Sequence, residues 1–248
     1  KQGADLLQQV SSANKLAVLG GVDQKKALET TISLTNAFSI ASKDLGENIN
    51  FLNAVENQTV LSIEDLTVAI PKAAPVVKQL GGNVEDLAFF MTAMKEGGVN
   101  ASEGANALKS GLASLINPTN AAVNKFKTFG IDLLGIVNNN AGNVTGTILA
   151  LQSALDNLDP LKKQQAIEQL FGKFQFARMN ALFSNLGKQG SQTLQVLDLM
   201  KASSQDLAKI AGRELAQVTE SASGKYRRAL EGLKADLAGV GDQFLNIN

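Results

Sequence analysis

The feature that most constrains the fold is a helix-start signature that recurs along the first half of the chain. Ser62, Asn83 and Asn100 are each followed three residues later by an acidic residue. A Ser or Asn side chain just before a helix accepts a hydrogen bond from a free backbone N–H, and an acidic side chain three residues on can accept one from the capping residue. Glycine pairs at 81–82 and 97–98 precede two of these starts and are typical of helix ends. The pattern predicts short helices joined by tight turns.

The stretch Asn100–Gly130 predicts a tight hairpin of two helices. One apolar face of its first helix is formed by Ala101, Ala105, Leu108, Leu112 and Leu115. A second stripe holds only small residues, Gly104, Ala107, Gly111 and Ser114. Two glycines inside a helix cost about 1 kcal/mol each relative to alanine, so we expect them to admit a close neighbouring backbone. We interpret the stripe as a helix-packing site.

The ends of this hairpin follow from proline and glycine. Pro118 disfavours a helical conformation in Asn117, so the first helix is predicted to stop there and Asn100 with Glu103 to form its capping box. A second helix is predicted from about Thr119 to Gly130. It should bury Val123, Phe126 and Phe129.

Other capping and helix-breaking residues predict the remaining helices before residue 137. Residues 1–19 have a loose helical pattern that the glycines at 20–21 break, and Asp23 is a predicted cap for a helix that runs to about Ser42. Gly46 is predicted to separate this helix from the next one. Pro71 and Pro75 each remove a backbone donor, so we expect a kink or break near Ile70.

After this point the predicted elements alternate with loops. Residues 137–146, VNNNAGNVTG, are predicted to be a loop, and the next helix is lined by Ile148, Leu151, Leu155 and Leu158. Asp159 and Pro160 start another helix that Gly172 closes. We expect a core cluster of Phe171, Phe174, Phe176 and Phe183. Residues 194–216 are predicted to be one helix.

The end of the chain has a regular heptad pattern, which we call the C-terminal seam. Its apolar residues alternate at spacings of four and three, as in a coiled coil: Tyr226, Leu230, Leu233, Leu237, Val240, Phe244 and Ile247. Because a lone helix cannot bury such a stripe, we expect it to mediate self-association, as a trimer. Together these patterns predict an all-α protein without a β-sheet: a lead-in at 1–22, a compact array of helical hairpins at 23–187 and extended helices at 188–248.

A family resemblance enters at the hairpin. The run Glu96–Ile131, EGGVNASEGANALKSGLASLINPTNAAVNKFKTFGI, resembles the core region of the tape measure proteins of long-tailed bacteriophages. The shared pattern is a glycine turn, a helix rich in small residues, a Leu-x-x-Pro-Thr break and a Phe-x-x-x-Gly-Ile close. The resemblance extends through residues 61–82 and 158–182, which makes it about two-thirds of the chain. These are packing motifs and carry no chemistry.

The resemblance implies a structural role. Tape measure proteins fill the tail tube during assembly, set its length and leave ahead of the DNA. Implied partners are the tube protein, tail-tip or baseplate hub proteins, assembly chaperones and further copies of the chain. It also implies a place in the virion, assembly in the host cytoplasm and transient contact with the host membrane.

Composition excludes several other classes. There is no cysteine or histidine, so disulfides, thiolate metal sites and the usual general base are absent. Lys and Arg number 23 against 23 Asp and Glu, which is not the basic excess of a dedicated nucleic-acid binder. No apolar run approaches the roughly 20 residues that span a bilayer. We therefore expect no enzyme activity, cofactor, metal or specific nucleic acid. The chain begins with Lys1, so we expect it to belong to a longer protein.

Candidate chemical sites have simpler explanations. The neighbouring carboxylates 64–65 and 85–86 could form acid–base dyads, but adjacent helical residues point apart, and we interpret them as compensation of the helix dipole. The sequence after Asp156 and Asp159 lacks the alternating ligand series of a calcium loop. We therefore expect these two residues to mark the end of one helix and the start of the next. The basic cluster 225–228 is interpreted as a solvated face rather than a phosphate contact. Two other functions stay open: a helical scaffold unrelated to phages, and a membrane-active helical protein.

Overall fold

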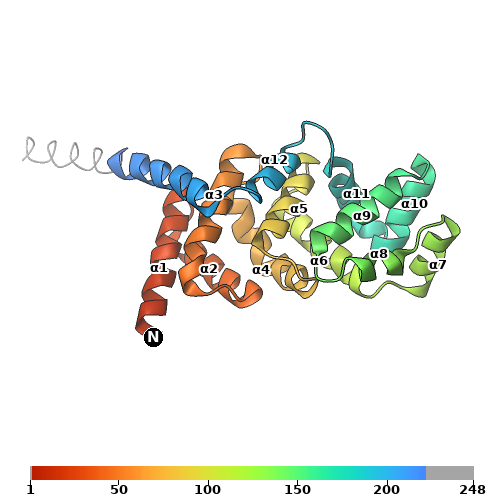
Figure 1. Ribbon diagram of the computed structural model, residues 1–248, viewed down its shortest axis with the longest axis horizontal. Helices are drawn as coiled ribbons and strands as arrows, with labels where there is room; N and C mark the ends of the chain where they lie inside the picture. The colour runs from red at the N-terminus through yellow and green to blue at the C-terminus, as the bar shows by residue number, and fades with distance from the viewer. Residues whose placement is uncertain (1, 222–248) are drawn as a thin grey trace, which may run out of the picture.

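The computed structural model describes residues 2–221, with side chains from Asp5 onward, and within that range all regular secondary structure is helical (Figure 1). The predicted all-α class is confirmed. A 3₁₀ turn at Ser42–Asp44 precedes α3, and residues 204–221 form a further helix after α12. The other helices are α1 Gln2–Leu19, α2 Gln24–Phe38, α3 Leu45–Gln58, α4 Ile63–Gln79, α5 Val84–Glu96, α6 Ala101–Ile116, α7 Asn120–Thr128, α8 Leu133–Asn139, α9 Val144–Asp156, α10 Pro160–Phe171, α11 Lys173–Asn185 and α12 Gln192–Leu199.

The helices pack into an elongated body, with α1 and α2 at one end and α7 and α10 at the other (Figure 1). Helix α4 packs against α6 and α2, and α5 packs against α11 and α12. Most buried apolar side chains form one core that runs from α2 to α12 and includes Leu207 of the following helix. A second, smaller core lies under α1 and includes Leu16, Ile49, Ile63 and Ala211.

The predicted helix starts are confirmed at Ser62, Asn83 and Asn100. Ser62 and Asn83 form complete capping boxes with Asp65 and Asp86. Asn100 also caps its helix, since its side chain accepts the backbone N–H of Glu103 at 2.9 Å. The predicted reciprocal bond, in which the Glu103 carboxylate accepts the backbone N–H of Asn100, is not formed. That carboxylate instead lies 3.4 Å from Arg178 NH2 on α11, so an ion pair between helices replaces the second half of the box.

Of the kink or break predicted near Ile70, the break is wrong, because α4 continues through both Pro71 and Pro75. The two prolines lie four residues apart on the same exposed side of the helix. The carbonyls that lose their partners, those of Thr67 and Pro71, are therefore on the side nearest to solvent. Ile70, about 100° around the helix from Pro71, is fully buried in the main core.

Other predicted boundaries shift in the structure. Helix α2 ends at Phe38 rather than Ser42, and its C-cap, Ser39, has a left-handed φ of 58°. Gly46 does not divide two helices but lies in the first turn of α3. The predicted helix over residues 194–216 is interrupted at 200–203, where Ser203 caps the next helix by accepting the N–H of Asp206 at 3.2 Å.

The loop predicted at residues 137–146 is shorter than expected. Residues 137–139 belong to α8, which the sequence did not predict, and α9 begins at Val144. The turn between them lies against the turn between α4 and α5: a Cβ added to Gly81 would lie 2.5 Å from Gly142 Cα. Gly81 has a φ of 82°, so both this backbone conformation and the close approach require glycine.

The predicted phenylalanine cluster is only partly present. Phe171 and Phe183 are buried with ring centroids 5.7 Å apart. Phe176 is half-buried, and Phe174 is 91% exposed. Phe174 lies in the first turn of α11, directly after the Gly172 break, where the helix has not yet reached its neighbours. In the predicted hairpin, Phe126 is buried and Val123 and Phe129 are half-buried.

Candidate functional site

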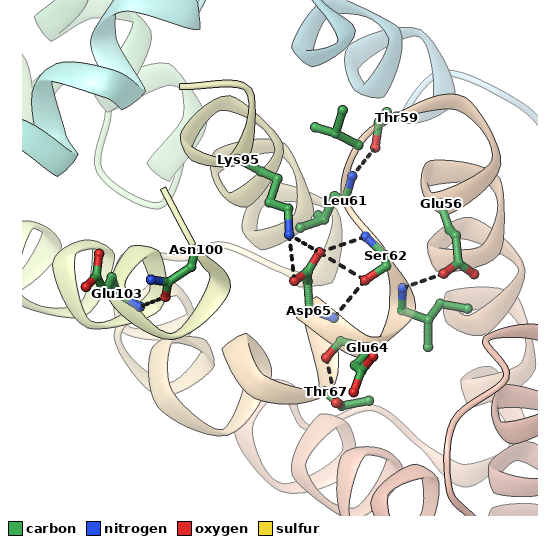
Figure 2. Close-up of polar contacts among 12 residues, drawn as sticks. Glu56, Thr59, Leu61, Ser62, Glu64, Asp65, Thr67, Lys95, Asn100 and Glu103 are labelled. Carbon is green, nitrogen blue, oxygen red and sulfur yellow. Dashed lines mark hydrogen bonds and ion pairs between the residues drawn. The ribbon is translucent and has the colours of Figure 1, made fainter. Parts of the chain in front are cut away.

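The densest polar network joins the start of α4 to the end of α5 (Figure 2). Lys95 Nζ donates to Asp65 Oδ1 at 2.9 Å and to Oδ2 at 2.8 Å. The same Oδ2 accepts the backbone N–H of Ser62 at 3.1 Å and its hydroxyl at 2.9 Å. Asp65 therefore completes a helix cap and an ion pair between two helices with one carboxylate.

The charges in this network connect α4 to α5. Burial by itself would raise the pKa of Asp65, but the hydrogen bonds from Lys95 and Ser62 outweigh it and lower the pKa. Glu64 is exposed and lies 3.3 Å from Lys26 on α2, so it points away from Asp65. The two carboxylates thus serve different partners, as expected for adjacent helical residues.

The second carboxylate pair also diverges. Asp86 completes the capping box of α5, and Glu85 is half-buried on another side of the helix, where burial, then the charge of Asp86, raises its pKa. Asp159 caps α10 by accepting the N–H of Lys162 at 3.0 Å, and Asp156 pairs with Lys163 at 2.5 Å. Each acid of this loop has its own lysine.

Glu56, like Glu85, is an acidic residue of the described chain whose pKa is raised. Its Oε1 accepts the backbone N–H of Ile63 at 2.9 Å (Figure 2). Burial raises the pKa of Glu56; the hydrogen bond from Ile63 opposes the rise, and the charges of Glu214 and Asp65 add to it. Between its unfolded and folded pKa values, the folded state binds more protons, so the free energy of unfolding falls as pH rises through that window.

We expect Glu56→Gln to raise the melting temperature near neutral pH, because glutamine keeps the acceptor oxygen and removes the charge. The gain should vanish below about pH 4, where both states of the wild type carry a protonated Glu56. Thermal melts followed by circular dichroism across this range measure it. Glu29→Gln, at an exposed site of α2, is the matched control and should show little change. A lower melting temperature for Glu56→Gln at neutral pH would contradict the prediction.

The predicted small-residue stripe faces the interior. Gly104, Ala107 and Gly111 are buried, and Ser114 is half-buried. A Cβ at Gly111 would lie 2.9 Å from Met179 Sδ, and one at Gly104 would lie 3.1 Å from Met91 Cε. The close neighbours are thus flexible methionine side chains from α11 and α5, and not the backbone that we expected.

We expect Gly111→Leu to lower the free energy of unfolding by about 1–3 kcal/mol, because leucine would overpack a site already closed by Met179 and Phe171. Chemical denaturation measures the change. Gly46→Ala is the control: it lies in α3 with nothing within 4 Å of an added Cβ, so it should gain up to about 1 kcal/mol of helix stability. A stabilised Gly111→Leu variant would show that α6 is not tightly packed there.

Two further carboxylates join distant parts of the chain, and sequence reasoning missed both. Glu96, the last residue of α5, accepts the N–H groups of Gln192 at 2.7 Å and Thr193 at 2.9 Å and so caps α12. Glu214 Oε2 accepts the side-chain amides of Asn53 at 2.9 Å and Asn57 at 2.8 Å on α3. Partners 96 to 161 residues apart leave no local signature in the sequence.

One of several surface cavities lies near the end of the Asn100–Gly130 hairpin. It measures about 490 Å³, lies between α8 and α9, and is lined by apolar residues such as Ile136 and Leu158 together with asparagines. Its one titratable group, Asp132, already caps α8 through the N–H of Gly135 at 2.9 Å. The cavity therefore offers no acid–base pair. Exposed large apolar side chains include Leu6, Leu7 and Leu161.

Two other kinds of site are absent from residues 2–221. Acidic side chains in this range form no group of three or more that could hold a metal ion. None of the helices described there is both long and apolar enough to cross a membrane. The C-terminal seam and the basic cluster 225–228 lie outside the described residues.

Comparison with known proteins identifies a family for the chain. Residues 1–172 match the family described as phage-related minor tail protein. The chain belongs to this family. Membership gives the chain a structural role in a phage tail. The matched range runs from α1 to the Gly172 turn and so includes the Asn100–Gly130 hairpin.

A relative of the chain supports the same role. The chain is 21% identical over 211 residues to the tape measure protein of Pneumococcus phage Dp-1. The alignment covers 85% of the chain but 18% of that relative, so the chain spans less than a fifth of the relative's length. No solved structure matches the chain.

Proposed function

We propose that the chain is a folded segment of a tape measure protein, which sets tail length, occupies the tail tube and leaves ahead of the DNA. The observation that carries the proposal is the alignment of 85% of the chain with a phage tape measure protein. The resemblance of residues 96–131 to the core region of that family points the same way.

Within such a protein, this segment is proposed to serve as a docking or folding module rather than as the ruler. A continuous helix rises about 1.5 Å per residue, so 248 residues could span roughly 370 Å. The chain instead folds back repeatedly, and α12 packs on α5 and α3. Tail length would then be encoded by long helices elsewhere in the parent protein.

The proposed partners follow from the tape measure role. They are the tail tube protein, tail-tip or baseplate hub proteins, tail assembly chaperones and other copies of the chain, in a virion assembled in the host cytoplasm. Transient contact with the host membrane is part of the same proposal, and a liposome leakage assay tests it. We propose that the C-terminal seam carries self-association as a trimer, which light scattering of the chain tests directly.

The tail-length role can be tested in the phage that encodes the chain. Removing whole heptads from long helices of the parent protein, outside this segment, should shorten tails by about 10 Å for each heptad, as seen by electron microscopy of purified virions. Mass spectrometry of the same virions should find peptides of this chain. Tails of unchanged length, or virions without these peptides, would contradict the proposal.

A further inference from the structure

The helix at residues 204–221, here called the arm, touches the rest of the protein along one narrow stripe. Leu207 and Ala211 are buried, Glu214 and Leu215 are half-buried, and the remaining arm residues are exposed. In Figure 1 the arm, in blue, passes α1 and runs away from the other helices. Over the described residues 204–221, the arm buries little apolar surface and so receives little stabilisation from the body.

The polar contact between arm and body is a single carboxylate that accepts two side-chain amides. Glu214 accepts the side-chain amides of Asn53 and Asn57, but no lysine or arginine among residues 2–221 lies within 4.0 Å of its carboxylate. Its charge instead faces Glu56, whose pKa it raises. Asn53 is fully buried, and its Oδ1 has no hydrogen-bond partner. A buried acceptor left unpaired is unfavourable and offsets part of the gain from the two amide bonds.

Helix α12, which comes just before the arm, is held much more firmly. Glu96 caps it with two backbone hydrogen bonds, and Val196 and Leu199 lie in the main core, to which the described part of the arm adds one residue, Leu207. The non-helical residues 200–203 separate α12 from the arm, and Ser203 gives the arm its own cap. The arm is therefore an independent helical unit with a hinge at its base.

We infer that the arm is a releasable strap, which opens about residues 200–203 while the body stays folded. Release would uncover the small core that Ala211 closes, including Leu16, Ile49 and Ile63 from three helices. The strap thus controls access to an apolar surface formed by α1, α3 and the start of α4. This follows from the contacts of the arm alone and holds whether or not the chain acts in a tail.

Hydrogen exchange of the full 248-residue chain, read by mass spectrometry, tests the inference. Backbone amides of residues 207–215 should exchange at least about tenfold faster than those of α4 and α6, because local opening exposes them without global unfolding. Ala211→Glu, which changes a fully buried arm residue, should abolish protection in the arm and leave exchange in α4 and α6 within about twofold of the wild type. Gln217→Glu, an exposed site on the same helix, is the matched control and should change neither.

The wild-type measurement decides the matter even if Ala211→Glu does not fold. Arm amides that exchange at the same rate as those of α4 and α6 would show that the arm opens with global unfolding, and would overturn the inference. A loss of protection of equal size in arm and body on Ala211→Glu would overturn it too. Faster exchange confined to the arm supports it.

Discussion

Phe183→Ala is expected to lower the free energy of unfolding by about 3–5 kcal/mol, while Phe174→Ala in the same helix should change it by less than about 0.5 kcal/mol. Phe183 is 1% exposed and packs against Phe171, whereas Phe174 is 91% exposed. The first substitution leaves a cavity in the core and the second removes side-chain atoms that are already in water.

Urea denaturation of the two variants, followed by circular dichroism, measures the difference. The pair is controlled internally, because residue type, substitution and helix are the same and the depth of burial differs. Similar losses at both sites would mean that Phe174 has a partner in solution, such as a second copy of the chain. Similar small effects would mean that α11 does not pack as described.

Removing the Asn100–Gly130 hairpin from the parent protein should abolish tail assembly. The hairpin contains α6, which packs against α4, α5, α10 and α11. Its loss would expose their buried faces, including Phe171 and Met179, and the segment could not refold around the gap. Plaque formation and electron microscopy of lysates measure the outcome. Lys109→Ala, at an exposed position of α6, should leave plaque numbers unchanged.

A different result would assign the hairpin a different role. Viable phage with tails shorter by about 1.5 Å for each residue removed would show that this segment is extended in the tail and acts as ruler. Viable phage with tails of unchanged length would show that the hairpin is dispensable for assembly.

Local signals predicted much of this fold. Ser62, Asn83, Asn100 and Asp159 begin helices because each satisfies backbone N–H groups within its own first turn, which a short window of sequence contains. The break at 200–203 could have been predicted in the same way, since Ser203 and Asp206 repeat the signature of Ser62 and Asp65.

The incorrect predictions concern features that depend on contacts between residues far apart in the sequence. Pro71 and Pro75 are tolerated because α4 presents both to the exposed side, a fact of tertiary packing. Phe174 has the composition of a core residue, but the turn at Gly172 leaves it outside the body. The role of Glu96 at the start of α12 depends on a partner 96 residues away.

That separation between Glu96 and α12 has a consequence for synthesis. Ribosomes add about 5–20 residues per second, so roughly 5–20 seconds pass between the emergence of α5 and that of the helix that covers it. During this interval, the side of α5 that receives Val196 and Leu199 has no cover from its own chain. In that time, another protein that binds the uncovered side of α5 can compete with α12 for that side before the chain finishes folding.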